Sequence, residues 1–140
     1  MLNRIIFGAL LLLTSLNADA EASAQSDPGY TERLQQRAEF VAKFAGESVD
    51  SVKFRVFDGY EPLSTNSLII YERGSRAYLL TVTYCWDLPW TGTIGGISDY
   101  ETIYVRMNVI STAKMRCTIT EIRPVDSKAM KAAEKAIKSG

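Results

Sequence analysis

The sequence contains no histidine. That absence excludes a Ser-His-Asp triad, a Cys-His dyad, a zinc site with histidine ligands and a histidine-based pH switch. Any catalysis by this chain is therefore restricted to carboxylates, lysine, tyrosine, serine or cysteine.

Net charge is absent as well. The chain has 16 Lys and Arg against 16 Asp and Glu, so its formal net charge is zero. A protein without a global field does not attract nucleic acid by long-range electrostatics, and we expect no nucleic-acid partner. The apolar fraction, 46% of 140 residues, is that of an ordinary globular domain.

Cysteine occurs only twice, at Cys85 and Cys117. This spacing is far from C-x-x-C, which removes a thioredoxin-like redox role. Two cysteines without histidine also supply too few soft ligands for a thiolate metal site. We therefore predict a structural disulfide, in a chain with no metal and no cofactor.

The chain also lacks an apolar run long enough to cross a membrane. Its N-terminal run, residues 5–13, follows the basic Arg4 and precedes the small residues of Ala18-Asp19-Ala20. A basic start, a short apolar stretch and a small-x-small site are typical of a secretory signal peptide. Because about 20 residues are needed to span a bilayer, we expect no transmembrane segment in the mature chain.

Cleavage is expected near Ala20, although Ala22 and Ala24 also fit the small-residue rule. The mature protein is then periplasmic or secreted. Its remaining length suits one domain with one modest core. The predicted organisation is a signal peptide at 1–20, a flexible leader at 21–29 and a single α+β domain at 30–138.

Helical periodicity is found at both ends of this domain. Across 31–45 apolar residues recur at helical spacing, with Thr31 as the expected N-cap and Gly46 as the expected C′ residue. A second helix is expected from Asp126-Ser127 to about residue 138. Its four lysines share one face, which we interpret as solvated rather than as a lipid-binding surface.

Between the helices the apolar period changes to two. The predicted strands are 49–56, 67–72, 77–85, 101–109 and 115–123, with a short sixth at about 93–97. The loop 73–76 makes a tight hairpin, turn signals at 58–66 separate the first two strands, and Pro124 is expected to end the last. The prediction is an α+β fold: five or six antiparallel strands, in a single sheet or half-open barrel, flanked by two helices.

The strands around the two cysteines carry a recognisable pattern. A Tyr78-Leu79-Leu80 strand ends in Cys85, and Arg116-Cys117-Thr118-Ile119 is followed by the segment 122–126. In these motifs the chain resembles a family of small secreted proteins of Gram-negative bacteria whose function is not known. The resemblance covers roughly residues 52–126. It implies a fold and a disulfide, and it transfers no activity.

One short motif suggests catalysis. Ser111-Thr112-Ala113-Lys114 matches the S-x-x-K of penicillin-recognising enzymes, in which the serine is the nucleophile. That motif requires a helix, whereas this segment is predicted to be a turn between strands. The S-D-N and K-T-G partners are absent, and we interpret the match as a coincidence of four residues. We therefore assign no catalytic residue.

The loop after the third strand contains both tryptophans of the chain and lies close to several acids. Exposed, these side chains would bind a sugar, a peptidoglycan fragment or a protein; buried, the tryptophans would plug one end of the barrel and cover the disulfide. Both interpretations remain open from the sequence. The candidate ligand- or partner-binding residues are Trp86, Asp87, Trp90, Asp99, Glu101 and Tyr104.

The absence of a coherent catalytic set favours a non-enzymatic binding or envelope-associated module. Its expected partner is an envelope protein or a cell-wall or lipid component. The alternative is a small carboxylate-based hydrolase of envelope glycans. In that case Asp99 and Glu101 would lie on the same side of an extended stretch and act as an acid pair.

Overall fold

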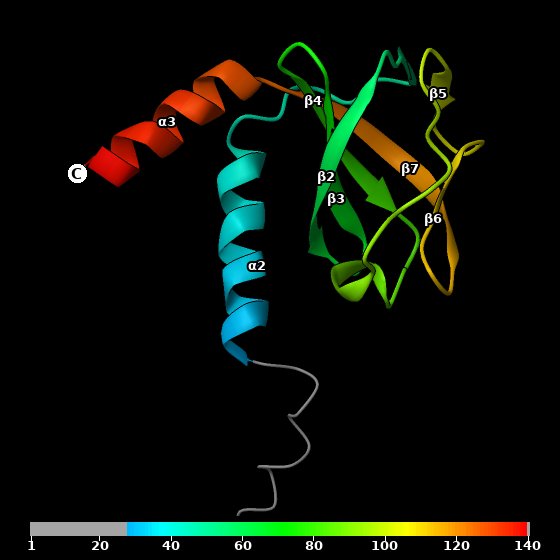
Figure 1. Ribbon diagram of the computed structural model, residues 1–140, viewed down its shortest axis with the longest axis horizontal. Coiled ribbons are helices and arrows are strands. Elements are labelled where there is room, and N and C mark those ends of the chain that lie inside the picture. The colour runs from blue at the N-terminus through cyan, green and yellow to red at the C-terminus, as the bar shows by residue number, and fades with distance from the viewer. Residues whose placement is uncertain (1–27, 140) are drawn as a thin grey trace, which may run out of the picture.

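A computed structural model describes residues 28–139. The signal peptide predicted at 1–20 lies outside these residues. The described chain confirms an α+β fold in which two helices flank an antiparallel sheet (Figure 1). In chain order the elements are α2 (Pro28–Ala42), β1 (Ser51–Lys53), β2 (Phe57–Ser64), β3 (Ser67–Glu72), β4 (Arg76–Val82), η1 (Leu88–Trp90), β5 (Thr102–Tyr104), β6 (Val109–Ser111), β7 (Arg116–Val125) and α3 (Ser127–Ser139).

The main sheet has five strands in the order β2-β3-β4-β7-β6, and every neighbouring pair is antiparallel. Strands β1 and β5 form a separate two-stranded sheet. Isolated bridges join Val49 to Ile122 of β7 and Gly95 to Ser111 of β6. The segments that contain Val49 and Gly95 are thus attached to the β7–β6 side of the sheet. The main sheet is thereby curled into a half-barrel.

An apolar core lies on each face of the main sheet. Inside the curl, Leu68 and Ile70 of β3 belong to the larger cluster. Between them, Ile69 points to the outer face, where Val41 of α2 and Met130 of α3 pack against it in a second cluster. Because both faces are covered, β3 and β4 are almost continuously apolar instead of alternating.

Strand β2 corrects the sequence prediction for this segment. Residues 58–66 were expected to form a turn, but β2 runs through most of them and pairs with β3. The register shifts between Phe57 and Gly59, where Gly59 has φ +145°, and shifts again just after Pro62. Since β2 is an edge strand, bulges and a proline disturb only one ladder.

The predicted strand 101–109 is in fact two strands separated by a turn. Between β5 and β6 lies Arg106, a non-glycine residue with φ +66°. A continuous strand would place Met107 on the same face as Ile103, but Met107 lies in this turn and is 77% exposed. A local left-handed residue is invisible to a pattern of period two.

Proline positions explain two further differences. Helix α2 begins at Pro28 rather than after Thr31, because proline is favourable in the first helical turn. Strand β7 continues through Pro124 to Val125: the Pro124 carbonyl accepts a hydrogen bond from the Gly46 amide at 2.8 Å, and Val125 still pairs with Ala77. Proline therefore does not end these elements where expected: Pro28 begins α2, and Pro124 lies within β7.

The predicted N-terminal cap of the last helix is confirmed. The Ala129 amide donates to Asp126 Oδ1 at 3.0 Å, just ahead of α3. Only the first turns of α3 pack on the sheet, and Figure 1 shows its end projecting away from the strands. Ile137 is accordingly 67% exposed, although its spacing placed it on the apolar face.

An ionic network ties both helices to the outer face of the sheet. Arg37 of α2 donates to Glu61 of β2 at 2.7 and 3.2 Å and to Glu134 of α3 at 2.9 Å. The Tyr71 hydroxyl of β3 donates to Glu61 at 3.0 Å. Partial burial, followed by the negative charge of Glu61, raises the pKa of Tyr71 to about 12.

Raising the pH from 10 to 11 is expected to destabilise the protein. In this window folded Tyr71 keeps its proton, whereas the unfolded chain loses it near pH 10, so the free energy of unfolding falls as the pH rises. We expect a loss of about 1 kcal/mol, because solvent still reaches the phenol. Urea unfolding at pH 8, 10 and 11 measures it. The Tyr71→Phe variant should show a smaller decrease of the unfolding free energy with pH. If the decrease is the same as in the wild type, it comes from other groups, such as Tyr78, whose pKa is also raised by burial.

Candidate functional site

The tryptophans do not plug the half-barrel. Trp86 is 45% and Trp90 51% exposed. The residues between them, Leu88 and Pro89, are buried, and Leu88 belongs to the inner core. Leu88 of η1 thus fills this end of the curl, while both indole rings remain accessible to a ligand.

Asp87 has a role within the fold. Its side chain is buried, and it accepts hydrogen bonds from the Thr112 hydroxyl at 2.5 Å and the Lys114 amide at 3.1 Å. These contacts hold the turn that joins β6 to β7. The S-x-x-K segment is therefore strand and turn rather than helix, as the sequence predicted, and its serine lacks the helical frame of that motif.

The acid pair is not arranged as the sequence suggested. Tyr100, between Asp99 and Glu101, has φ +62°, so this stretch is not extended and alternate residues do not share a side. Asp99 Oδ1 accepts a hydrogen bond from the Phe57 amide at 2.9 Å. Asp99, Glu101 and the half-exposed Tyr104 are accessible, but they form no described cluster with the tryptophans.

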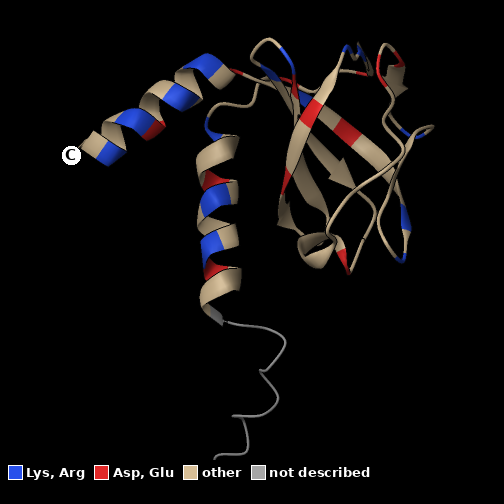
Figure 2. Ribbon diagram, in the orientation of Figure 1, with Lys and Arg blue, Asp and Glu red and all other residues tan. Residues whose placement is uncertain are grey.

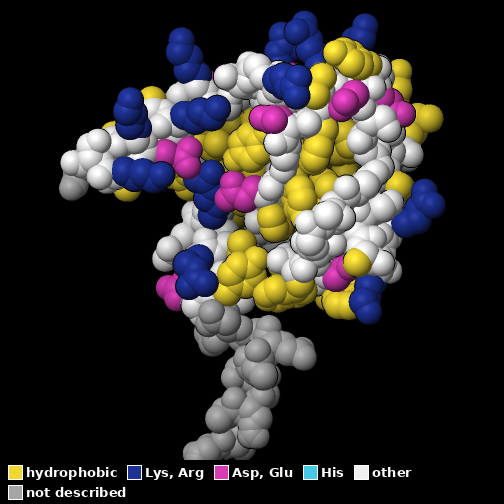
Figure 3. Space-filling model, in the orientation of Figure 1, with side chains coloured by type: hydrophobic (Ala, Val, Ile, Leu, Met, Phe, Trp, Pro, Cys, Tyr) yellow, Lys and Arg dark blue, Asp and Glu magenta, His cyan; other side chains and the backbone are white. Residues whose placement is uncertain are grey.

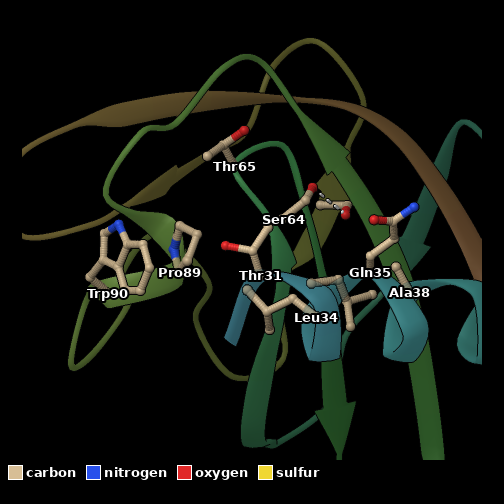
Figure 4. A pocket seen from close by; sticks show the side chains of 10 residues that line it. Thr31, Leu34, Gln35, Ala38, Ser64, Thr65, Pro89 and Trp90 are labelled. Carbon is tan, nitrogen blue, oxygen red and sulfur yellow. Dashed lines mark hydrogen bonds between the residues drawn. The ribbon is translucent and has the colours of Figure 1, made fainter. Parts of the chain in front are cut away.

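A groove lies between α2, the β2–β3 turn and η1. Its volume is about 400 Å³, within the range of small-ligand pockets. Figure 4 shows Trp90 and Pro89 on one side of the groove and Gln35 and Ala38 on the other, with Thr65 between the two sides. The walls are mostly apolar carbon, and no lining residue is charged.

Hydrogen bonds fix the walls of this groove. The Tyr30 hydroxyl donates to the Pro89 carbonyl at 2.9 Å, and the Tyr30 and Trp90 rings lie 5.0 Å apart between centroids. The Tyr60 hydroxyl donates to the Thr91 carbonyl at 3.0 Å. Both contacts tie η1 to its neighbours, one to α2 and one to β2. The groove is therefore formed before a ligand arrives.

Sequence reasoning found one wall of the groove and missed the other. Trp90 was among the candidates, but Thr31, Leu34 and Gln35 were assigned to a helix that packs on the domain. Leu34 indeed lies on the apolar stripe, yet it is only half-buried. The width of the apolar stripe on this helix was the only available sign that some of its residues would remain partly exposed and line a groove.

Within residues 28–139, no group of three or more cysteine or carboxylate side chains is placed to hold a metal ion. Neither α2 nor α3 combines the length and apolar character needed to cross a membrane.

The chain matches the model of a protein family. The model of a family described as a family of unknown function (DUF6491) matches residues 2–140, which include every element of the described fold. No curated protein and no solved structure matches the chain. The family description names no activity.

Proposed function

Because the chain belongs to the DUF6491 family of unknown function, we propose from its geometry that it is a non-enzymatic binding module of the periplasmic or secreted space. The proposed ligand is an uncharged segment of a cell-wall glycan. The proposed site is the groove between α2, the β2–β3 turn and η1.

The groove carries this proposal through its combination of an aromatic ring with hydroxyl groups. A sugar ring has an apolar face, which stacks on an exposed indole such as Trp90, and a rim of hydroxyls. Thr31 and Thr65 supply hydroxyl partners in the groove. An acyl chain would fit the apolar wall but would leave these hydroxyls without partners. The side-chain chemistry thus favours a glycan over a lipid tail.

The same lining argues for binding rather than catalysis. Its polar side chains are hydroxyls and one amide, and none of them titrates near neutral pH. General acid–base catalysis requires a group that gives or takes a proton beside the ligand. The groove has no such group, so a bound glycan would be held without being cleaved.

Two observations support the proposed compartment. The N-terminal residues have the order of a secretory signal peptide. The Cys85–Cys117 disulfide is of the kind that persists in oxidising compartments.

Trp90→Ala is expected to weaken the binding of soluble peptidoglycan glycan strands by about tenfold, because about 1 kcal/mol or more comes from ring stacking. Calorimetric titration measures this effect. The matched control is Trp86→Ala, which removes the other exposed indole and should leave the affinity unchanged. Equal losses in both variants, or no saturable binding by the wild type, would overturn the proposal.

Fluorescence provides a second readout. In Trp86→Phe, Trp90 is the only tryptophan of the chain, so its emission reports on the groove alone. We expect the emission to shift to shorter wavelength as the glycan displaces water from the ring. An unchanged spectrum at saturating glycan would place the binding elsewhere and contradict the assignment.

A further inference from the structure

A second hollow lies at another part of the molecule. Its lining is positively charged, whereas the groove proposed to bind a glycan has no charged residue. It has a volume of about 310 Å³ and is lined by Lys53, Phe54, Arg55, Arg76 and Tyr100. None of these residues lines the glycan groove. Figure 2 marks basic residues both in the segment after β1 and at the β3–β4 hairpin, which lie at the same end of the sheet. Figure 3 shows basic side chains projecting from that end.

Three cations meet here from three positions in the chain. Lys53 ends β1, Arg55 follows two residues later, and Arg76 starts β4. All three are exposed. Among the described residues, only Arg76 of the three forms an ion pair, with its Nε 4.0 Å from Glu72 Oε1. Neither Lys53 nor Arg55 forms an ion pair with a described carboxylate.

The buried carboxylate of Glu72 anchors the cluster of three cations. Its side chain is fully buried, and Oε2 accepts a hydrogen bond from the Arg55 amide at 2.5 Å. Oε1 has no hydrogen-bond partner and faces Arg76. A buried carboxylate is tolerated only where positive charge and donors compensate it. Glu72 therefore holds the Arg55 backbone and the Arg76 side chain in place, while three cations outnumber its single charge.

Tyr100 forms the remaining wall with an unusual backbone. Its φ is +62°, a region that bulky residues seldom adopt, and its amide donates to the Arg55 carbonyl at 2.7 Å. The neighbouring Asp99 accepts a hydrogen bond from the Phe57 amide, and neither Asp99 nor Glu101 lines the hollow. The lining thus presents cations and a phenol without a carboxylate.

We propose that this cationic pocket, defined by Lys53, Arg55, Arg76 and Tyr100, binds a phosphate monoester group. Guanidinium groups match the oxygens of phosphate by paired hydrogen bonds, and lysine adds a point charge. A dianion satisfies an excess of positive charge better than a single carboxylate does. This site is independent of the glycan groove, and the phosphate belongs either to a free molecule or to a lipid headgroup.

The test is NMR titration of the full mature chain with inorganic phosphate, against chloride at the same ionic strength. Saturable shifts of the Lys53, Arg55 and Tyr100 amides with phosphate alone support the proposal. The Lys53→Gln/Arg55→Gln pair should weaken binding at least tenfold. The matched control, Lys131→Gln/Lys135→Gln on α3, removes the same charge far from the pocket and should not.

A second arm separates the two sources of phosphate. Co-sedimentation uses vesicles of phosphatidylcholine with and without phosphatidic acid, whose headgroup is a phosphate monoester. Binding only to vesicles with phosphatidic acid, lost in the pocket variant, identifies a lipid-borne phosphate, whereas shifts with inorganic phosphate and no sedimentation identify a free one. Equal effects of chloride and phosphate, equal losses in the two variant pairs, or no binding in either arm would overturn the proposal.

Discussion

Cys117→Ser is expected to lower the melting temperature of the protein by about 10–15 °C. The Cys85–Cys117 bond joins residues separated by 32 positions, and the loop-entropy model gives such a cross-link about 3–4 kcal/mol. In a domain of this size, 1 kcal/mol corresponds to about 4 °C. Both cysteines are fully buried in the inner core, so a serine hydroxyl there adds a desolvation cost.

Calorimetry of the oxidised and reduced wild type is the direct measurement. The reduced wild type should melt close to the Cys85→Ser/Cys117→Ser double variant, because both lack the same constraint. If the oxidised and reduced proteins melted at the same temperature, the bond would contribute nothing to stability and the prediction would be wrong.

Gly96→Ala is expected to destabilise the protein by about 3–5 kcal/mol. Gly96 has φ +97°, and a Cβ added there would lie 2.1 Å from the Val109 carbonyl oxygen. The backbone on both sides would have to move apart. Just before it, Gly95 and Ser111 exchange two hydrogen bonds at 2.8 and 2.9 Å, which attach this loop to β6. The substitution therefore breaks the attachment that closes this side of the half-barrel.

Two other glycines separate the causes of this effect. Gly74→Ala introduces a side chain at φ +98° with open space around it, so its cost reports the backbone conformation alone. Gly92→Ala also meets open space and has no left-handed backbone, and it should be nearly neutral. Urea unfolding should rank the losses as Gly96, then Gly74, then Gly92. Similar losses at Gly96 and Gly74 would show that the clash is relieved cheaply.

Much of the architecture could be predicted because it follows from local patterns. The β3–β4 hairpin combines two apolar runs with a short turn, and Ser67–Glu72 was predicted to the residue. Helix α3 carries its own cap at Asp126. Some errors arose where strand pairing overrides the turn propensity of single residues. Gly59 and Pro62 are turn residues by propensity, but pairing with β3 draws them into an edge strand.

The candidate sites were harder to predict because their walls come from distant segments. Trp90 meets Thr31 and Leu34 only after α2 has docked beside η1, and no spacing in the sequence encodes that contact. Likewise, Lys53 and Arg76 become neighbours through the curl of the chain. Residue type alone pointed to single candidates such as Trp90. The groove and the cationic pocket could not be predicted, because the tertiary fold brings their walls together.

The place of the disulfide in the sheet also affects the order in which the chain folds. The bond lies beyond the Val82–Ile119 pair, at the end of the ladder between β4 and β7. Without it, pairing these strands requires a search over a long loop, which is entropically costly and slow. Once it has formed, the covalent path between the paired residues is only a few residues long, as in a hairpin. In the oxidised chain, the pairing of the main sheet that joins the most distant strands is therefore as local as that of a hairpin.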